Sequence, residues 1–153
     1  MTRLTGPRAV LYGTLVVGTL DALDAIVFFG LRSGAQPIRI FQGIAYGLIG
    51  PAARTGGLKT AALGVLLHYF IAFGIVLTYF LVSRRVRLLT RHPVMCGLLY
   101  GIVAYAVMNL VVLPLSKVGG PSMPATPVLV NGILIHMFGV GLPSALFARA
   151  ARS

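Results

Sequence analysis

Long apolar segments alternate with short polar ones along this chain, and the apolar segments determine the expected fold. Four of them, at residues 9–31, 60–82, 94–113 and 128–148, are about 20 residues long, which is enough for a helix to cross a hydrocarbon layer of about 30 Å. Arginine, lysine, glycine and proline are concentrated between them. The pattern predicts an all-α integral membrane protein with four transmembrane helices, forming one helical-bundle domain over residues 1–153.

A further apolar segment, residues 38–50, differs from the other four in length. As a helix of about 13 residues it would extend only about 20 Å, which is short for a membrane crossing. Gln42 and several glycines make it less apolar. We therefore predict a short re-entrant or interfacial helix, which requires that protein cover its backbone ends.

Prolines mark the ends of the later helices. Pro93 is expected to begin the third transmembrane helix and Pro114 to end it, because proline suits a first helical turn and disrupts a later one. Pro143, which follows Gly139 and Gly141, is expected to kink or weaken the last third of the fourth helix.

The positive charges predict an orientation. With four crossings and a cytoplasmic N-terminus, the cytoplasmic side receives Arg3, Arg8, Arg84, Arg85, Arg87, Arg91, Arg149 and Arg152. The outer side receives Arg32, Arg39, Arg54, Lys59 and Lys117. This bias follows the positive-inside rule, and a fifth crossing would place the cluster between Arg84 and Arg91 outside. We expect a multi-pass membrane protein with both termini cytoplasmic.

The composition excludes several classes of protein. At 58% hydrophobic and 10% charged residues, the chain is too apolar for an ordinary soluble domain. The net charge of +11 is spread over the helix ends and forms no basic patch interleaved with aromatics, so we expect the lipid bilayer as partner and no nucleic acid. Cys96 is the only cysteine, so no intrachain disulfide forms. No enzyme motif is present, and we expect no catalytic activity.

The only acidic residues, Asp21 and Asp24, lie inside the first apolar segment. That segment is longer than the apolar region of a signal peptide, so we expect it to be retained. A carboxylate in hydrocarbon costs about 2.5–3.5 kcal/mol and suggests a functional site. At 1.5 Å per residue, both carboxylates and the imidazoles of His68 and His136 fall about 10–15 Å from the outer helix ends. The supporting polar residues are Asn109, Asn131, Tyr69 and Tyr105.

Three physical interpretations fit four polar groups at one depth. In the first, they satisfy one another and fix the order of the helices. In the second, Asp21, Asp24, His68 and His136 bind a proton or a cation, because carboxylate and imidazole carry protons and also bind Zn²⁺ or Mn²⁺. In the third, His68 and His136 are axial ligands of a b-type haem, although two carboxylates at the same level fit the apolar edge of a haem poorly.

The functional hypothesis favoured here is a transport-type protein in which the Asp/His group binds the cation or proton, with a homo-oligomer supplying a complete pathway. The alternative is a non-catalytic accessory or structural subunit of a larger membrane complex. It would dock through glycine-rich faces such as Gly97 with Gly101, or Gly43 with Gly47, although packing within the chain is the more common use of such pairs.

Part of the sequence resembles known small membrane proteins. The resemblance is carried by His68, the stretch from Met108-Asn109 to Pro114-Leu115-Ser116, and His136. These features resemble small uncharacterised inner-membrane proteins of bacteria and, more faintly, the YagU-like family. The resemblance covers roughly the second half of the chain and does not include the acidic pair. It implies a small polytopic bacterial membrane protein and no particular reaction or cofactor.

Overall fold

The computed structural model describes residues 4–120 and 124–152, and within these ranges the regular structure is entirely helical. The α-helices are α1 (Gly6–Ser33), α2 (Pro37–Ile49), α3 (Gly57–Arg85), α4 (Leu88–Arg91), α5 (Pro93–Val107), α6 (Leu113–Leu115), α7 (Thr126–Ile135) and α8 (Leu142–Ala150). A 3₁₀ turn, η1 (Gly50–Arg54), follows α2, and two π-helical turns, η2 (Met108–Val112) and η3 (His136–Gly141), continue α5 and α7.

The four transmembrane helices predicted from the sequence are confirmed as elements. Helices Gly6–Ser33, Gly57–Arg85, Pro93–Leu115 and Thr126–Ala150 are long and apolar enough to cross a membrane. Each extends a few residues beyond its predicted limits, because the polar residues at the ends continue the helix past the apolar core. The fold is thus that of an all-α membrane protein.

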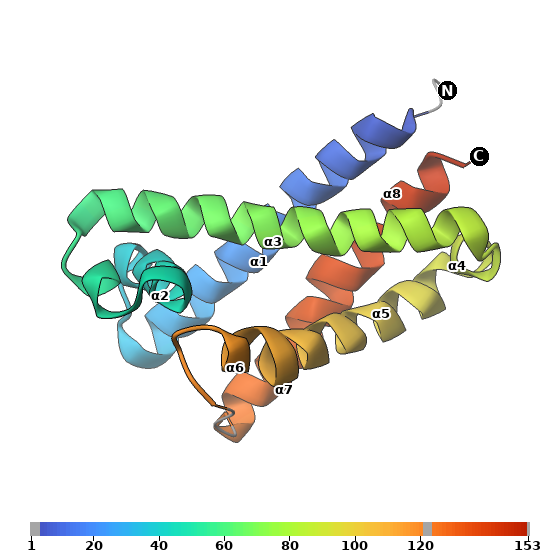
Figure 1. Ribbon diagram of the computed structural model, residues 1–153. Coiled ribbons are helices and arrows are strands. Elements are labelled where there is room, and N and C mark those ends of the chain that lie inside the picture. The colour runs from blue at the N-terminus through green and yellow to red at the C-terminus, as the bar shows by residue number, and fades with distance from the viewer. Residues whose placement is uncertain (1–3, 121–123, 153) are drawn as a thin grey trace.

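The short helix α2 lies within one residue of its predicted range and is separate from the four long helices. Gly34 ends α1 in the left-handed conformation (φ 66°), and Pro37 occupies the first turn of α2. Helix α2 then packs beside the first half of α3 (Figure 1). The two backbones approach closely at Gly64, where a side-chain methyl group would overlap the Phe41 carbonyl.

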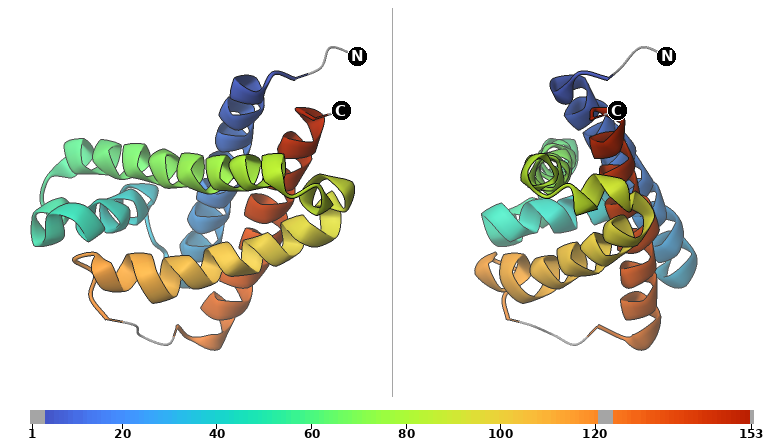
Figure 2. Two further views of the ribbon diagram at one scale, coloured as in Figure 1. Left: turned by 45° about the vertical axis from the view of Figure 1, so that its right-hand side comes forward. Right: turned by 90° about the vertical axis from the view of Figure 1, so that its right-hand side faces the viewer.

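The long helices are not a parallel bundle. Helix α1 crosses α3 obliquely, and α8 runs beside α1 (Figures 1 and 2). The N-terminal end of α1, the C-terminal end of α8 and helix α4 lie at one end of the molecule, whereas α2, η1 and α6 lie at the other (Figure 1).

Glycines allow the helices to touch. The predicted pair Gly97 and Gly101 is used within the chain: a methyl group at Gly97 would lie 2.9 Å from the Gly141 oxygen, and one at Gly101 would lie 2.6 Å from the Met137 Cα. Helix α5 therefore packs directly on the backbone of η3. Because small residues let helix backbones approach, these contacts are the expected source of stability between membrane helices.

The two later prolines lie beside π-helical turns. Pro114 was expected to end the third helix, which ends one residue after it, at Leu115. Pro143 was expected to kink or weaken the last third of the fourth helix, which continues to Ala150. Each proline is the second residue after a π-helical turn, η2 or η3. A proline lacks the N–H for the usual bond and its ring clashes with the carbonyl four residues earlier, and a wider turn before the proline relieves both problems.

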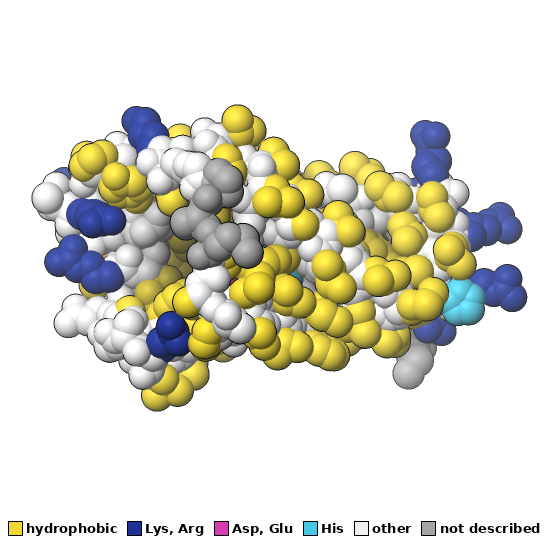
Figure 3. Space-filling view, turned by 90° about the horizontal axis from the view of Figure 1, so that it is seen from below, with side chains coloured by type: hydrophobic (Ala, Val, Ile, Leu, Met, Phe, Trp, Pro, Cys, Tyr) yellow, Lys and Arg dark blue, Asp and Glu magenta, His cyan; other side chains and the backbone are white. Residues whose placement is uncertain are grey.

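Large apolar side chains cover the outside of the helices. Leu66 is 67% exposed and Phe70 69% exposed, and both lie on the middle of α3. Apolar side chains spread over much of the face seen in Figure 3. The buried core is small, with Val17, Val76 and Val140 at one cluster. Such an exterior is suited to lipid, where apolar side chains need not be hidden.

Candidate functional site

A cavity of about 700 Å³ lies among the helices and opens toward the end of the molecule that carries α2. Its walls come from α1, α2, α3, the η2–α6 segment and η3, and they are mainly aliphatic. Volumes of about 300–1,000 Å³ are typical of sites that bury small ligands. The polar side chains in its lining are those of Asp21, Arg39, His68, Asn109, Ser116 and His136.

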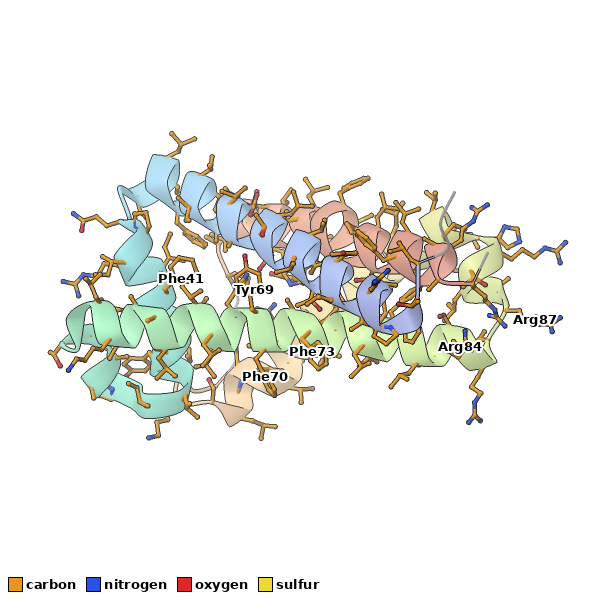
Figure 4. All side chains as sticks on the ribbon, turned by 90° about the horizontal axis from the view of Figure 1, so that it is seen from above. Phe41, Tyr69, Phe70, Phe73, Arg84 and Arg87 are labelled. Carbon is orange, nitrogen blue, oxygen red and sulfur yellow. The ribbon has the colours of Figure 1, made fainter. Side chains whose placement is uncertain are left out.

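The cavity follows from the way α1 and α3 cross. They touch at two glycines: a methyl group would lie 2.9 Å from a Val76 carbon at Gly13 and 2.6 Å from the Tyr69 ring at Gly18. Beyond this crossing the two helices separate toward the α2 end, and Tyr69 points to α1 while Phe70 and Phe73 lie on the opposite side of α3 (Figure 4). Both helices line the cavity, α1 with residues such as Asp21 and Phe29 and α3 with residues such as Leu67 and Ile75.

Gln42 holds α2 at the edge of the cavity. Its side chain is 3% exposed, and its Nε2 donates to the Gly57 carbonyl over 3.1 Å and to Thr60 Oγ1 over 3.4 Å, at the start of α3. The sequence pattern marked Gln42 only as a weakness in an apolar segment. In the structure it fastens the short helix to α3 and so fixes one wall of the cavity.

Asp21 on α1 and His68 on α3 lie close together in the wall of the cavity. Asp21 Oδ2 lies 3.9 Å from His68 Nδ1, which is within the range of an ion pair but longer than a hydrogen bond. The other ring nitrogen, Nε2, is 2.7 Å from the Gly18 carbonyl oxygen. A carbonyl oxygen only accepts, so Nε2 must carry a hydrogen. The nitrogen facing Asp21, Nδ1, is therefore the acceptor nitrogen when the ring is neutral.

His136 lines the same cavity in the opposite tautomer. Its Nδ1 is 2.9 Å from the Gly132 carbonyl, so Nδ1 carries the hydrogen and Nε2 is the acceptor nitrogen when the ring is neutral. The Tyr105 ring packs edge-on against the imidazole at 5.3 Å. Asn109 donates to the Tyr105 carbonyl over 2.9 Å. The Asp21 carboxylate is within electrostatic range of both His136 and His68.

Asp24 has a different partner from Asp21. Its Oδ2 accepts a 2.7 Å hydrogen bond from Asn131 Nδ2 on α7, and it is absent from the cavity lining. Tyr69 likewise bonds elsewhere: its hydroxyl is 2.9 Å from Thr19 Oγ1. Of the four residues predicted to form one site, three line the cavity, and the fourth joins two helices beside it.

This geometry adds no support for the metal or the haem interpretation of the site. Among residues 4–120 and 124–152, no three histidine, cysteine, aspartate or glutamate side chains come close enough together to hold a metal ion. The four-residue metal site stays a prediction. A bis-histidine haem needs a ligating nitrogen on each ring; Nε2 of His68 is engaged by the Gly18 carbonyl, which leaves Nδ1 beside Asp21. The haem interpretation also stays a prediction.

Two features of the site were not foreseen from the sequence. The Gly18 carbonyl, which orients His68, is a backbone group that no residue pattern distinguishes. Arg39 was expected only as an outer loop charge, yet its side chain lines the opening of the cavity. The only sequence feature that could have indicated this is that Arg39 follows Pro37 in the first turn of the short helix α2.

Together, the long apolar helices and the polar groups inside the cavity define a class: polytopic helical membrane proteins with a ligand-sized cavity among the spans. No model of a known protein family matches the chain, and no curated protein or solved structure is significantly similar to it. The resemblance to the YagU-like family stays a prediction.

Proposed function

We propose that the chain is a transport-type membrane protein in which Asp21 and His68 together bind one proton inside the cavity. The observation that carries the proposal is the 3.9 Å approach of Asp21 Oδ2 to His68 Nδ1, with Nε2 of the same ring already committed to the Gly18 carbonyl. The pair faces a cavity large enough for a small ligand.

Electrostatics favour one proton on this pair. With none, the carboxylate is an unpaired charge within the membrane span, and with two, the imidazolium is. With one proton, the pair is either two neutral groups or an ion pair, and neither leaves a net charge. Transfer between these forms moves a proton between two helices, α1 and α3, at the cavity wall.

His136, on η3, supports the proposal because it lines the same cavity and lies within electrostatic range of Asp21. Its acceptor nitrogen is Nε2, because Nδ1 donates to the Gly132 carbonyl. Asn109, which lines the same space, offers a further polar group. His136 and Asn109 therefore offer further polar groups, within the same cavity, to a proton or small cation released from the Asp21–His68 pair.

The proposal places the protein in the bacterial inner membrane with the α4 end toward the cytoplasm. Arg84 and Arg87 lie at that end (Figure 4), together with both described ends of the chain, and the positive-inside rule assigns such an end to the cytoplasm. Arg3 lies outside the described residues. A bundle of this size is thin for a complete pathway, so the proposal includes a homo-oligomer.

Nitrogen-15 NMR of histidine-labelled protein tests the shared proton, because the chain has only three histidines. We expect His68 and His136 to show opposite neutral tautomers. Asp21→Asn should change the nitrogen-15 chemical shift of His68 Nδ1, which lies 3.9 Å from the Asp21 carboxylate, whereas Asp24→Asn, whose carboxylate bonds to Asn131 instead, should leave it nearly unchanged. His92, exposed beside α4, serves as the internal reference. A His68 Nδ1 signal that Asp21→Asn leaves unaltered would refute the shared proton.

Reconstituted vesicles test the transport part. With a pH-sensitive dye inside, vesicles containing the wild-type protein should move protons in response to an imposed membrane potential, and Asp21→Asn should abolish the movement. Vesicles with Asp24→Asn are the matched control. Wild-type vesicles that are as proton-tight as protein-free ones would contradict a transport function.

A further inference from the structure

A second, smaller pocket adjoins the mouth of the cavity. It has a volume of about 340 Å³ and is lined by Arg39, Gln42, Gly43 and Arg54. Arg39 and Gly43 also line the large cavity, so the two spaces adjoin at these residues. One ligand that passes Arg39 and Gly43 would have its polar part between the arginines and its apolar part among the aliphatic walls.

Both arginines carry charges that no acidic side chain neutralises. Arg39 Nη1 donates to Gln42 Oε1 over 3.1 Å and to the Arg54 carbonyl over 3.0 Å, and both acceptors are neutral. The Arg54 guanidinium lies 5.1 Å from the Tyr46 ring centroid, also without an anion. The only acidic side chains of the protein are on α1, bonded to or facing other partners.

Two held guanidinium groups form a recognisable kind of site. Arginine offers five N–H donors in a planar fork that matches a phosphate, and charge-assisted bonds to phosphate are strong. Arg39 is kept in place by its two neutral acceptors, so little side-chain freedom is lost when an anion binds. The chemistry at this end of the cavity selects an anion, and a phosphate fits it.

The cavity walls beyond the arginines are mainly aliphatic, and this surface favours a hydrocarbon chain. Ile40, Ile44 and Leu48 from α2 face Ile71 and Ile75 from α3 across the cavity. Figure 3 shows apolar side chains within a hollow that basic side chains border. A free phosphate would leave this apolar space unused, whereas a lipid already present in the membrane fills both parts.

We infer that the cavity binds an anionic phospholipid, with its phosphate between Arg39 and Arg54 and one acyl chain in the space among α1, α2 and α3. This inference uses the cavity but not the proton on Asp21 and His68. It holds whether or not the protein moves protons, and it names a ligand for the cavity that the proton site alone does not require.

Gly43 provides the sharpest test, because it lines both spaces and has open room where a side chain would go. No atom lies within 4 Å of a methyl group placed there. Gly43→Leu therefore adds an isobutyl group at the junction, and its Cβ meets no other atom of the fold. Gly74, a helical glycine on α3 with equally open surroundings and no part in either pocket, gives the matched control Gly74→Leu.

The measurement is binding of dioleoyl phosphatidylglycerol to the full chain in a neutral detergent, by native mass spectrometry and by lipid-dependent thermal stabilisation. We expect Gly43→Leu and Arg39→Gln each to weaken binding by about tenfold or more, the second being the effect of losing one charge-assisted hydrogen bond. Arg39→Lys, which keeps the charge, should fall between. Gly74→Leu and Arg32→Gln, at an exposed arginine outside both pockets, should bind like the wild type.

Two competitors identify the source of the anion. Dioleoyl phosphatidylcholine has the same phosphate without a net charge and should bind more weakly, and inorganic phosphate in excess should not displace the anionic lipid. Equal binding of the two lipids, displacement by phosphate, or an equal loss in Arg32→Gln would each overturn the inference. Arg39→Gln should leave the His68 tautomer unchanged while it weakens lipid binding, so a failure of the proton proposal is distinguished from a failure of this one.

Discussion

The packing of α5 on η3 predicts a large effect from a single methyl group at Gly101. In Gly101→Ala the new carbon would lie 2.5 Å from the His136 carbonyl carbon and 2.6 Å from the Met137 Cα. Both are backbone atoms, so no side-chain rotation relieves the overlap. The helices must separate, and η3, which carries His136, must move with them.

The magnitude follows from a comparison with Gly74→Ala. Replacing glycine by alanine inside a helix favours the helix by about 0.5–1 kcal/mol, and this gain is common to both variants. Only Gly101→Ala incurs the cost of overpacking, about 1–3 kcal/mol. We therefore expect Gly101→Ala to be less stable than Gly74→Ala by about 1–3 kcal/mol, even though both substitutions improve helix propensity.

Equilibrium unfolding in mixed micelles, with increasing dodecyl sulfate and circular dichroism as the readout, measures the difference. Gly74→Ala should match or exceed the wild type, because open space surrounds that position. If both variants shift the unfolding curve equally, α5 and η3 do not approach closely in the folded protein. His136, which lies on η3, would then not be held at the cavity by this contact.

The same unfolding assay checks three further substitutions. Tyr100→Phe removes a 2.7 Å hydrogen bond from α5 to the backbone of α3 and should cost about 0.5–1.5 kcal/mol, whereas Tyr12→Phe, on an exposed position, should cost nothing measurable. Asn131→Ala removes the donor to the Asp24 carboxylate and should cost about 0.6–1.7 kcal/mol, the range for polar contacts between membrane helices. Gly18→Ala should cost about 1–3 kcal/mol by clashing with the Tyr69 ring, and NMR should show His68 released from its fixed tautomer.

The sequence was sufficient to predict the long helices because each one is determined by its own run of apolar residues. A helix that crosses a membrane must bury about 20 consecutive apolar residues, and this requirement is visible in the chain without any tertiary information. The short helix at residues 38–50 was found for the same reason, by a length that falls below the requirement. Its attachment to α3 through Gln42 was not found, because a side-chain bond to a distant backbone has no signature in the local pattern.

The π-helical turns were missed for a different reason. Pro114 and Pro143 correctly marked places where an ordinary helix is disturbed, but the disturbance has more than one structural solution. A chain can kink, end or widen by one residue, and packing decides which. Here Gly97 and Gly101 hold η3 against α5, and that contact joins segments about 40 residues apart in the sequence.

Asp21 and Asp24 show that a shared depth in the membrane does not determine which side chains contact each other. Helix rise placed Asp21 and Asp24 at nearly one level, and three-residue spacing placed them on one face. That face is broad, because residues three apart differ by about 60° around the helix axis. This difference is enough for Asp21 to face His68 on α3 while Asp24 bonds to Asn131 on α7. The two carboxylates therefore have separable roles, one beside a cavity and one between helices, and variants of each can be compared as mutual controls.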